Sequence, residues 1–129
     1  MSLTKEKEYL VLAKQLMSKA NLSKHRAARD KAGNPVNVFS ESAAAYCITG
    51  CITRACDMDI SAFKNIYAKL ETCIREYYPD TKYDKPMHWN DEPLRVKGDV
   101  LKMLDRLMKV YKIQPEPQQP NNPTTDLIA

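Results

Sequence analysis

Residues 43–56 form the segment that most restricts how this chain can fold, because almost every residue in it is small or apolar. A helix that is apolar on nearly all sides has to be buried on most of its surface. Gly50 lies inside the segment, where glycine costs about 1 kcal/mol relative to alanine, and close approach of another backbone is the usual compensation. We therefore predict a central helix over residues 43–55, capped by Ser40 or Ser42, with the other elements packed around it.

Three further segments have apolar residues at the three-and-four spacing of one helix face. They are residues 4–21, 60–77 and 91–112. Together with the central helix they predict a mostly α fold. We expect a single-domain bundle of about four helices over residues 1–112.

The tripeptide Trp89-Asn90-Asp91 precedes the last of these segments. Asn90 or Asp91 can cap the first turn of a helix by accepting backbone N–H groups. Trp89 can pack on that helix as a hydrophobic staple. We therefore interpret the tripeptide as a helix start; a ligand wall formed by Trp89 beside two polar side chains is the alternative.

A turn signal separates the first two helices. Asp30 can bond forward to the backbone, and Gly33 can adopt a positive φ, so the two bracket a four-residue turn. The sequence predicts a short β-hairpin over residues 26–38, which has to lie on the helices because a two-stranded ribbon is marginal alone.

Residues 113–129 differ in composition from the rest of the chain, with four prolines and several Gln and Asn residues. Such a segment cannot bury enough apolar area to order itself. We therefore predict a disordered Pro/Gln/Asn-rich tail, in which Leu127 and Ile128 are the candidate anchors for a partner.

The four cysteines do not form a metal motif. Cys47, Cys51 and Cys56 fall on the predicted central helix and Cys73 on the next helix. A zinc site needs closely spaced Cys-x-x-Cys or paired His ligands, which the chain lacks. We interpret these residues as small buried hydrophobes, with metal or redox chemistry as the alternative, and we expect no cofactor.

The sequence gives little support for catalysis. His25 and His88 are the only histidines, and they could form a general base with Asp30 or Asp91 if their loops met. Exposed loop histidines are the simpler interpretation. A strand–turn–helix serine is absent, and three glycines do not make a phosphate loop. We therefore expect that the protein is not an enzyme; a small-molecule site at Asp30 and residues 89–91 is a weaker alternative.

The net charge of +4 is unevenly distributed, with +5 in residues 1–31, −3 in 32–94, +4 in 95–112 and −2 beyond. The basic N-terminal part and the basic last helix could meet in one patch for phosphates or an acidic partner. Lysines that only solvate the outer faces of helices are the simpler interpretation. Within the basic N-terminal part, residues 19–31 concentrate Lys and Arg, which is compatible with nucleic-acid binding. Zinc-finger, homeodomain and basic-zipper patterns are absent.

Three short blocks occur in order along the chain. They are Ala28-Arg29-Asp30-x-x-Gly33-x-x-Val36, Ala44-x-x-Cys47-x-x-Gly50 and Trp89-Asn90-Asp91. Over residues 24–108 they resemble a group of small uncharacterised proteins encoded by bacteriophages and bacteria. That group has a final helix containing an aspartate, matched here by Asp105. The chain departs from the group at Cys51, where alanine is usual, and in its tail. The resemblance implies a mobile-element origin and no particular activity.

The leading hypothesis is a non-catalytic phage or mobile-element accessory protein that acts by protein–protein interaction. It would modulate a host or defence protein or be a minor particle component. The alternative is a nucleic-acid-binding accessory protein that uses residues 19–31. The candidate interaction residues are His25, Arg26, Arg29, Asp30, Trp89, Asn90, Asp91, Leu127 and Ile128.

We expect a cytoplasmic protein, or a virion component if a phage encodes it. The chain has no apolar run near the ~18 residues that span a membrane, and residues 1–6 lack the apolar stretch of a secretion signal. We expect a protein partner, with nucleic acid as the second class of partner and no membrane association. The sequence indicates no oligomeric state.

Overall fold

The computed structural model describes residues 3–79, 83 and 85–113, which contain five α-helices and three short strands. In chain order these elements are α1 (Leu3–Lys19), β1 (Asn21–Leu22), β2 (Ala28–Arg29), β3 (Ala45–Tyr46), α2 (Ile48–Cys56), α3 (Ile60–Tyr77), α4 (Pro86–Asn90) and α5 (Lys97–Val110). The predicted mostly α fold is confirmed, with α4 as an additional short helix. Apart from Ile113, the predicted tail lies outside the described residues.

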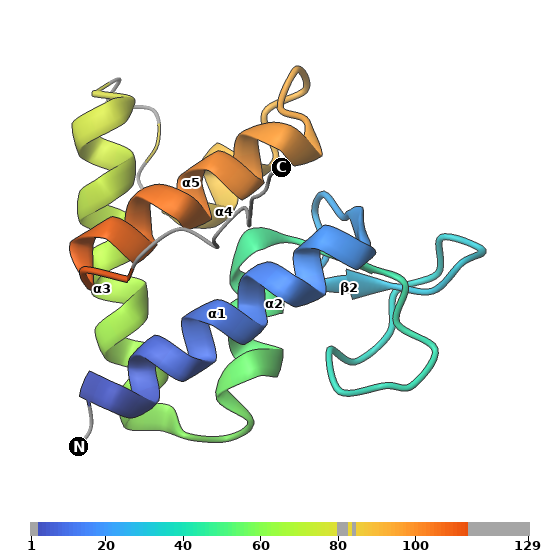
Figure 1. Cartoon of the computed structure of the whole chain (residues 1–129). Coiled ribbons are helices and arrows are strands. Elements are labelled where there is room, and N and C mark those ends of the chain that lie inside the picture. Colours follow the sequence, from blue (N-terminus) through green and yellow to red (C-terminus); the bar gives the residue numbers. More distant parts are fainter. Residues whose placement is uncertain (1–2, 80–82, 84, 114–129) are drawn as a thin grey trace, which may run out of the picture.

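The helices pack around α2, as expected for the most apolar segment. Figure 1 shows α1 and α5 side by side across one face, with α2 behind α1 and α3 standing steeply at the left. α2 contacts α1, α3 and α4, while α5 covers α1 and α3. One apolar core lies between them. The largest fully buried side chains are Trp89, Leu10, Met17, Ile48, Ile52, Ile66, Leu70, Ile74, Met103, Leu104, Leu107 and Val100.

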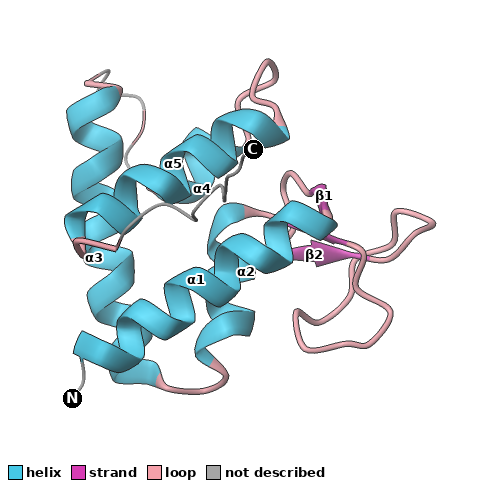
Figure 2. Ribbon diagram, viewed as in Figure 1, coloured by secondary structure: helices cyan, strands magenta, loops and turns pink. Residues whose placement is uncertain are grey.

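A small sheet lies beside the bundle, with its strands in the order β1-β3-β2 (Figure 2). β3 pairs in parallel with β1 and antiparallel with β2. The backbone N–H groups of Asn21 and Ser23 donate to the carbonyl oxygens of Ala44 and Tyr46 at 3.0 and 2.9 Å. The sheet therefore ties the end of α1 to the start of α2.

The central helix begins later than predicted. Residues 43–47 precede it, and α2 starts at Ile48 because the backbone groups of β3 are used by the strands on both sides. Cys47 is the N-cap, with its Sγ accepting from the N–H of Gly50 at 3.2 Å. The predicted caps Ser40 and Ser42 instead bond to each other, with 2.8 Å between their Oγ atoms.

The predicted turn is present, but its arms pair differently from a simple hairpin. The N–H of Gly33 donates to the carbonyl oxygen of Asp30 at 3.0 Å, and Gly33 has φ 90°. Short-range pairing continues where the N–H of Val36 donates to the carbonyl oxygen of Ala28 at 3.1 Å. β2 nevertheless pairs mainly with β3, which lies outside the predicted hairpin of residues 26–38.

The prediction that residues 89–91 start the last helix is wrong. Trp89 and Asn90 end α4, and Asp91 is its C-cap. Pro86 begins this short helix, since proline fits a first turn. α5 starts after a loop, at Lys97, where Oδ2 of Asp99 accepts from the N–H of Val96 at 3.1 Å. Asp99 therefore supports the start of the last helix.

A buried carboxylate fixes the N-terminal half of α1 to α3 and α5. Glu6 is 6 % exposed. Its Oε1 accepts from the hydroxyl of Tyr111 at 2.6 Å, and its Oε2 accepts from the amide of Asn65 at 2.9 Å. Burial and the Glu6 carboxylate together raise the pKa of Tyr111 above its ordinary value. Three helices are thus held together at one polar point in the core.

Within residues 3–79 and 85–113, none of the helices combines the length and the apolar character needed to cross a membrane.

Candidate interaction surface

The side chain of Asn90 joins three parts of the chain that are distant in sequence. Its Oδ1 accepts from the backbone N–H of Ile48, at the start of α2, at 2.9 Å. Its Nδ2 donates to the carbonyl oxygen of Ser23 at 2.9 Å and to Oδ1 of Asp91 at 3.0 Å. Asn90 is fully buried, so its amide replaces water at a helix N-terminus that lacks intrahelical acceptors. We term Ser23, His25, Ile48, Asn90 and Asp91 the Asn90 interlock.

Asp91 extends this interlock to the surface. Its Oδ1 accepts from the backbone N–H of His25 at 2.9 Å, and its Oδ2 lies 3.5 Å from Nδ1 of that residue. His25 has φ 70°, a conformation that costs a non-glycine residue about 1–2 kcal/mol. Nζ of Lys24 donates to the carbonyl oxygens of Glu92 and Pro93 at 2.6 and 3.0 Å. The loops that carry the two predicted residues His25 and Asp91 are therefore in direct contact.

Gly50 allows α2 to approach the loop before β2. A Cβ atom at this position would lie 2.1 Å from the carbonyl oxygen of Ala27. The N–H of Cys47 donates to that same oxygen at 3.0 Å. The close backbone approach predicted for Gly50 is confirmed. It brings α2 into contact with Ala27, which directly precedes the first sequence block.

The reactive groups near the interlock serve the fold. Burial raises the pKa of the Cys47 thiol, whose Sγ lies 3.1 Å from Oγ1 of Thr49; a neutral thiol is a poor nucleophile. The side chain of His25 is 73 % exposed and faces Asp91. His88 is exposed on α4. In the described part of the chain, no three His, Cys, Asp or Glu side chains gather as metal ligands would.

Asp30 lies apart from the interlock. Its Oδ1 accepts from two backbone N–H groups of its own turn at 3.0 and 2.9 Å. The guanidinium of Arg29 donates to the carbonyl oxygens of Gly33 and Lys24 at 2.8 and 3.0 Å, which braces the same turn. Arg26 is exposed. Of the three predicted residues Arg26, Arg29 and Asp30, only Arg26 is exposed, and the other two are half-buried.

Trp89 is a core residue. It is fully buried, its ring lies 5.5 Å from that of Tyr78, and the guanidinium of Arg95 lies 4.3 Å from its centre. It packs at the end of α4 rather than ahead of a helix as a staple. Leu127 and Ile128, the predicted anchors, lie outside the described residues.

A different surface lies at the other end of α2, where the chain turns into α3. It is a groove of about 210 Å³ with an almost entirely apolar lining. Its large side chains include Met58, Ile60 and Phe39, which are 71, 57 and 37 % exposed. We term it the Met58 groove, and its lining residues are Phe39, Thr53, Cys56, Met58, Asp59, Ile60 and Phe63.

The backbone at this groove has an unusual conformation. Asp57 and Met58, which connect α2 to α3, have φ angles of 47° and 74°. Asp57 is the C-cap of α2, and its N–H donates to the carbonyl oxygen of Thr53 at 3.2 Å. Aspartate tolerates this conformation, whereas a long side chain such as Met58 pays about 1–2 kcal/mol for it. Backbone outliers of this kind motivate a hypothesis of function.

Polar contacts hold the walls of the groove in place. The guanidinium of Arg54 donates to the carbonyl oxygens of Val38 and Ser40 at 2.8 and 3.3 Å, which fixes the loop on either side of Phe39. Oδ2 of Asp59 accepts from the hydroxyl of Tyr9 at 3.1 Å, while Oδ1 caps α3. The groove is therefore formed before anything binds to it.

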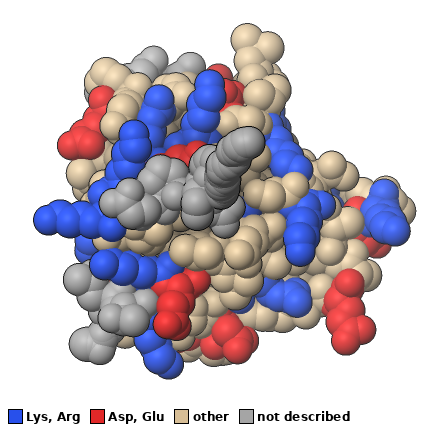
Figure 3. Space-filling view, in the orientation of Figure 1, with Lys and Arg blue, Asp and Glu red and all other residues tan. Residues whose placement is uncertain are grey.

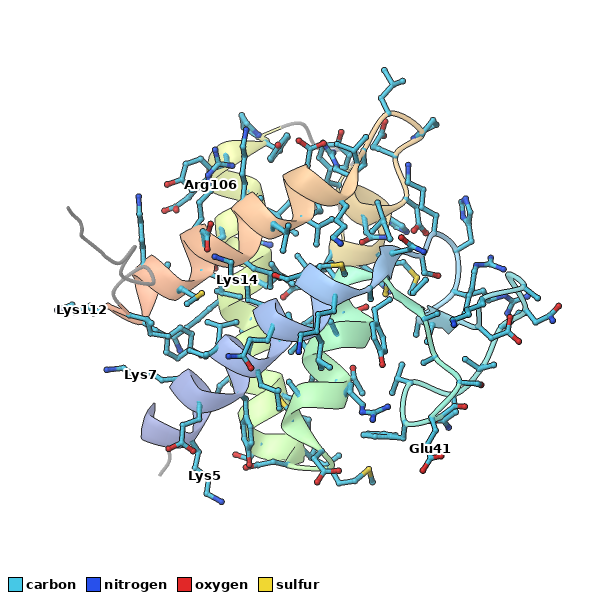
Figure 4. All side chains as sticks on the ribbon, turned by 45° about the vertical axis from the view of Figure 1, so that its right-hand side comes forward. Lys5, Lys7, Lys14, Glu41, Arg106 and Lys112 are labelled. Atoms are coloured by element: carbon cyan, nitrogen blue, oxygen red, sulfur yellow. The ribbon has the colours of Figure 1, made fainter. Side chains whose placement is uncertain are left out.

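Positive charge gathers elsewhere, on the face formed by α1 and α5. Lys and Arg side chains outnumber acidic ones on the face seen in Figure 3. Figure 4 shows Lys7 and Lys14 on α1 and Lys112 just after α5, whereas Glu41 lies at the lower right, away from them. The basic N-terminal part and the last helix lie together, since α1 and α5 contact each other. We term this the basic face, and the exposed or half-exposed lysines of α1, of α5 and just after α5 are Lys5, Lys7, Lys14, Lys19, Lys97, Lys102, Lys109 and Lys112.

Sequence reasoning missed the Met58 groove. The segment Asp57-Met58-Asp59 was interpretable only as a break that caps the next helix. The available signal was Met58 itself, a large apolar residue between two acids in a short connection between helices, where a side chain is readily exposed. The contribution of Phe39 had no such signal, because it depends on how the loop folds back on α2.

A family model supplies the relation of this chain to other proteins. The model of a family of unknown function, DUF6197, matches residues 1–110. The chain belongs to this family. The match spans the five described helices, the Asn90 interlock and the Met58 groove, so these features lie within the family's own domain. Membership agrees with the expected relation to uncharacterised proteins. No curated protein and no solved structure matches the chain.

Proposed function

We propose that the protein is a non-catalytic binding module that contacts another protein through the Met58 groove. The observation that carries this proposal is the exposure of Met58, Ile60 and Phe39 on one preformed apolar surface. Contiguous exposed apolar surface on a folded domain is typical of interaction sites. Scattered exposed side chains such as Leu94 do not have this significance.

The chemistry of the interlock supports a binding role over a catalytic one. Asn90 and Asp91 bond to backbone groups that maintain the fold. Raised thiol pKa values keep the buried cysteines neutral, and neutral thiols react slowly. An accessory role for a phage or another mobile element is part of the proposal, and it is supported by the resemblance of the three sequence blocks alone.

The test compares three full-length proteins as baits in extract from producing cells: wild type, Met58→Gly and the control Leu94→Ser. Leu94 is 91 % exposed and does not line the groove. A partner captured by wild type and Leu94→Ser is expected to be lost with Met58→Gly. The partner is then purified and titrated calorimetrically against all three. Equal affinity for all three proteins would refute the proposal.

Nucleic-acid binding is a second candidate function, favoured by the basic face. We place this candidate site on the basic face rather than in residues 19–31, because Lys24 and Arg29 bond internally to backbone carbonyls. Lys14 pairs with Asp105 and Lys97 donates to the carbonyl oxygen of Ser18, but Lys102 and Lys109 on α5 are exposed and are the proposed phosphate contacts. Such binding works by counterion release and weakens steeply with salt.

This second candidate is tested with a labelled DNA duplex and a single strand at several salt concentrations. Lys102→Glu/Lys109→Glu should weaken binding strongly, and Arg26→Glu should weaken it less. Binding that does not depend on salt, or that responds only to Arg26→Glu, would contradict a site on the basic face.

A further inference from the structure

We infer that the Met58 groove receives a short segment of a partner protein in which a large apolar side chain is flanked by Lys or Arg. This inference rests on the proposed function and adds the chemistry of the partner. It follows from the shape of the groove, which sets the apolar anchor, and from the charges on its rim, which set the flanking residues.

The groove has the size and lining of a receptor for individual side chains. Its volume is about 210 Å³, and among its lining residues Cys56 is buried while Met58 and Ile60 are exposed. Methionine adapts its shape to different apolar partners. One or two large aliphatic or aromatic side chains would therefore be held by contact with lining residues such as Met58 and Phe63.

The rim of the groove is acidic. Asp57 is exposed next to Met58, Asp59 is half-exposed, and Glu41 is exposed in the loop that carries Phe39. These carboxylates favour cations in a partner. They also disfavour the phosphates of nucleic acid or of an anionic membrane, which would meet like charge here.

Few cations offset these acids. The guanidinium of Arg54, on the α2 side, is bonded to the carbonyl oxygens of Val38 and Ser40. Lys64 is exposed one helical turn after Ile60 and is the nearest lysine along α3. Bonds to neutral carbonyl oxygens do not cancel the charge of Arg54, so the three carboxylates named above exceed the two cations Arg54 and Lys64 by one charge.

The experiment uses a library of random 12-residue peptides displayed on yeast, selected on full-length wild-type protein and counter-selected on Met58→Gly. Enriched peptides are expected to combine large apolar residues with an excess of Lys and Arg. Met58→Gly should lower the affinity of the best synthetic peptide at least about tenfold. Glu41→Gln/Asp57→Asn should lower it about threefold to tenfold at low salt and less at high salt.

Two controls match these variants. Leu94→Ser removes an exposed apolar side chain outside the groove, and Glu76→Gln removes an exposed charge near the end of α3. Both should leave the affinity unchanged. Thermal unfolding of each variant shows that it is folded before it is compared.

The outcomes separate the inference from the proposed function. Groove-dependent peptides without excess positive charge, or with affinity unchanged in Glu41→Gln/Asp57→Asn, would overturn the inference and leave protein binding standing. Concentration-dependent self-association abolished by Met58→Gly would assign the groove to a second copy and overturn the inference. Failure to enrich any peptide that distinguishes wild type from Met58→Gly would overturn both.

Discussion

Near each end of α2 lies a residue with a positive φ, and the surroundings of these two residues differ. Near the start of α2, His25 of the Asn90 interlock has φ 70°. After the end of α2, Met58 of the Met58 groove has φ 74°. The backbone N–H of His25 donates to Asp91, and the residue lies among polar contacts from three chain segments. Met58 instead directs an apolar side chain to solvent, where it is 71 % exposed.

The difference separates residues that maintain the fold from residues that are available for binding. The strain at His25 is offset by hydrogen bonds that position α2, so its cost serves the folded state. The positive φ of Met58 belongs to the turn between α2 and α3, in which the N–H of Asp59 donates to the carbonyl oxygen of Cys56 at 2.9 Å, but the Met58 side chain leaves apolar area in water. Changes at the interlock should therefore affect stability, and changes at the groove should affect binding.

Replacing Asn90 by Ala should produce the largest loss of stability. It leaves the N–H of Ile48 and the carbonyl of Ser23 buried without partners, at about 1–3 kcal/mol for each group. We expect a decrease of about 3–5 kcal/mol in the free energy of unfolding, measured by urea denaturation. Asn21→Ala, at an exposed asparagine, is the control and should change it by less than about 0.5 kcal/mol.

Gly50→Ala should destabilise the protein by about 3 kcal/mol, because overpacking costs 1–3 kcal/mol and the contact here is backbone against backbone. The added Cβ would lie 2.1 Å from the carbonyl oxygen of Ala27. Gly98→Ala is the matched control, since a Cβ there meets nothing within 4 Å. In α5 it should stabilise by up to about 1 kcal/mol. Equal effects of the two substitutions would contradict close packing at Gly50.

Alkaline pH should lower the free energy of unfolding through the buried thiol of Cys56, which lines the groove. Burial raises the pKa of Cys56 from 9.0 to about 11. Between these values the unfolded state loses the proton and the folded state keeps it, so stability falls as pH rises, by up to about 1.4 kcal/mol per pH unit. Below pH 9 the contribution is fully present. Urea denaturation from pH 8 to 10.5 should show a shallower decline for Cys56→Ala; parallel curves would count against the shift.

Met58→Gly should have the smallest effect on stability. Glycine removes a strain of about 1–2 kcal/mol at positive φ and adds about 0.4–1 kcal/mol of unfolded-state entropy. We expect a net gain of about 0.5 kcal/mol, visible as an unchanged or slightly raised Tm. Met58→Asn, which also tolerates this conformation, should behave similarly. A clear loss of stability in both variants would show that Met58 serves the fold, as His25 does.

Helical periodicity predicted the fold class because it reports which face of each segment is apolar. The glycine in an apolar helix also predicted close backbone packing, which Ala27 supplies. Local signals were less successful at helix starts. The residues before Ile48 form β3 because β1 and β2 pair with its two edges. A single segment of sequence does not reveal such distant partners.

The sites show the same limit. His25 and Asp91 were recognised as candidate residues from their type, but their contact depends on the position of α4, which no local pattern encodes. Asn90 was predicted to cap the helix that follows it, but it ends α4, and its side chain instead accepts from the N–H of Ile48 at the start of α2. The groove was missed because it combines side chains from two loops and two helices.

The most direct test of the account follows the methionine methyl groups in the full-length protein labelled with ¹³C-methyl methionine. The best groove-selected peptide, or the purified partner, is titrated into it. We predict that the Met58 signal shifts or broadens at the concentrations that saturate binding, while the buried Met17 and Met103 signals stay in place. Saturable binding that leaves the Met58 signal unchanged would contradict the assignment of the groove as the binding surface.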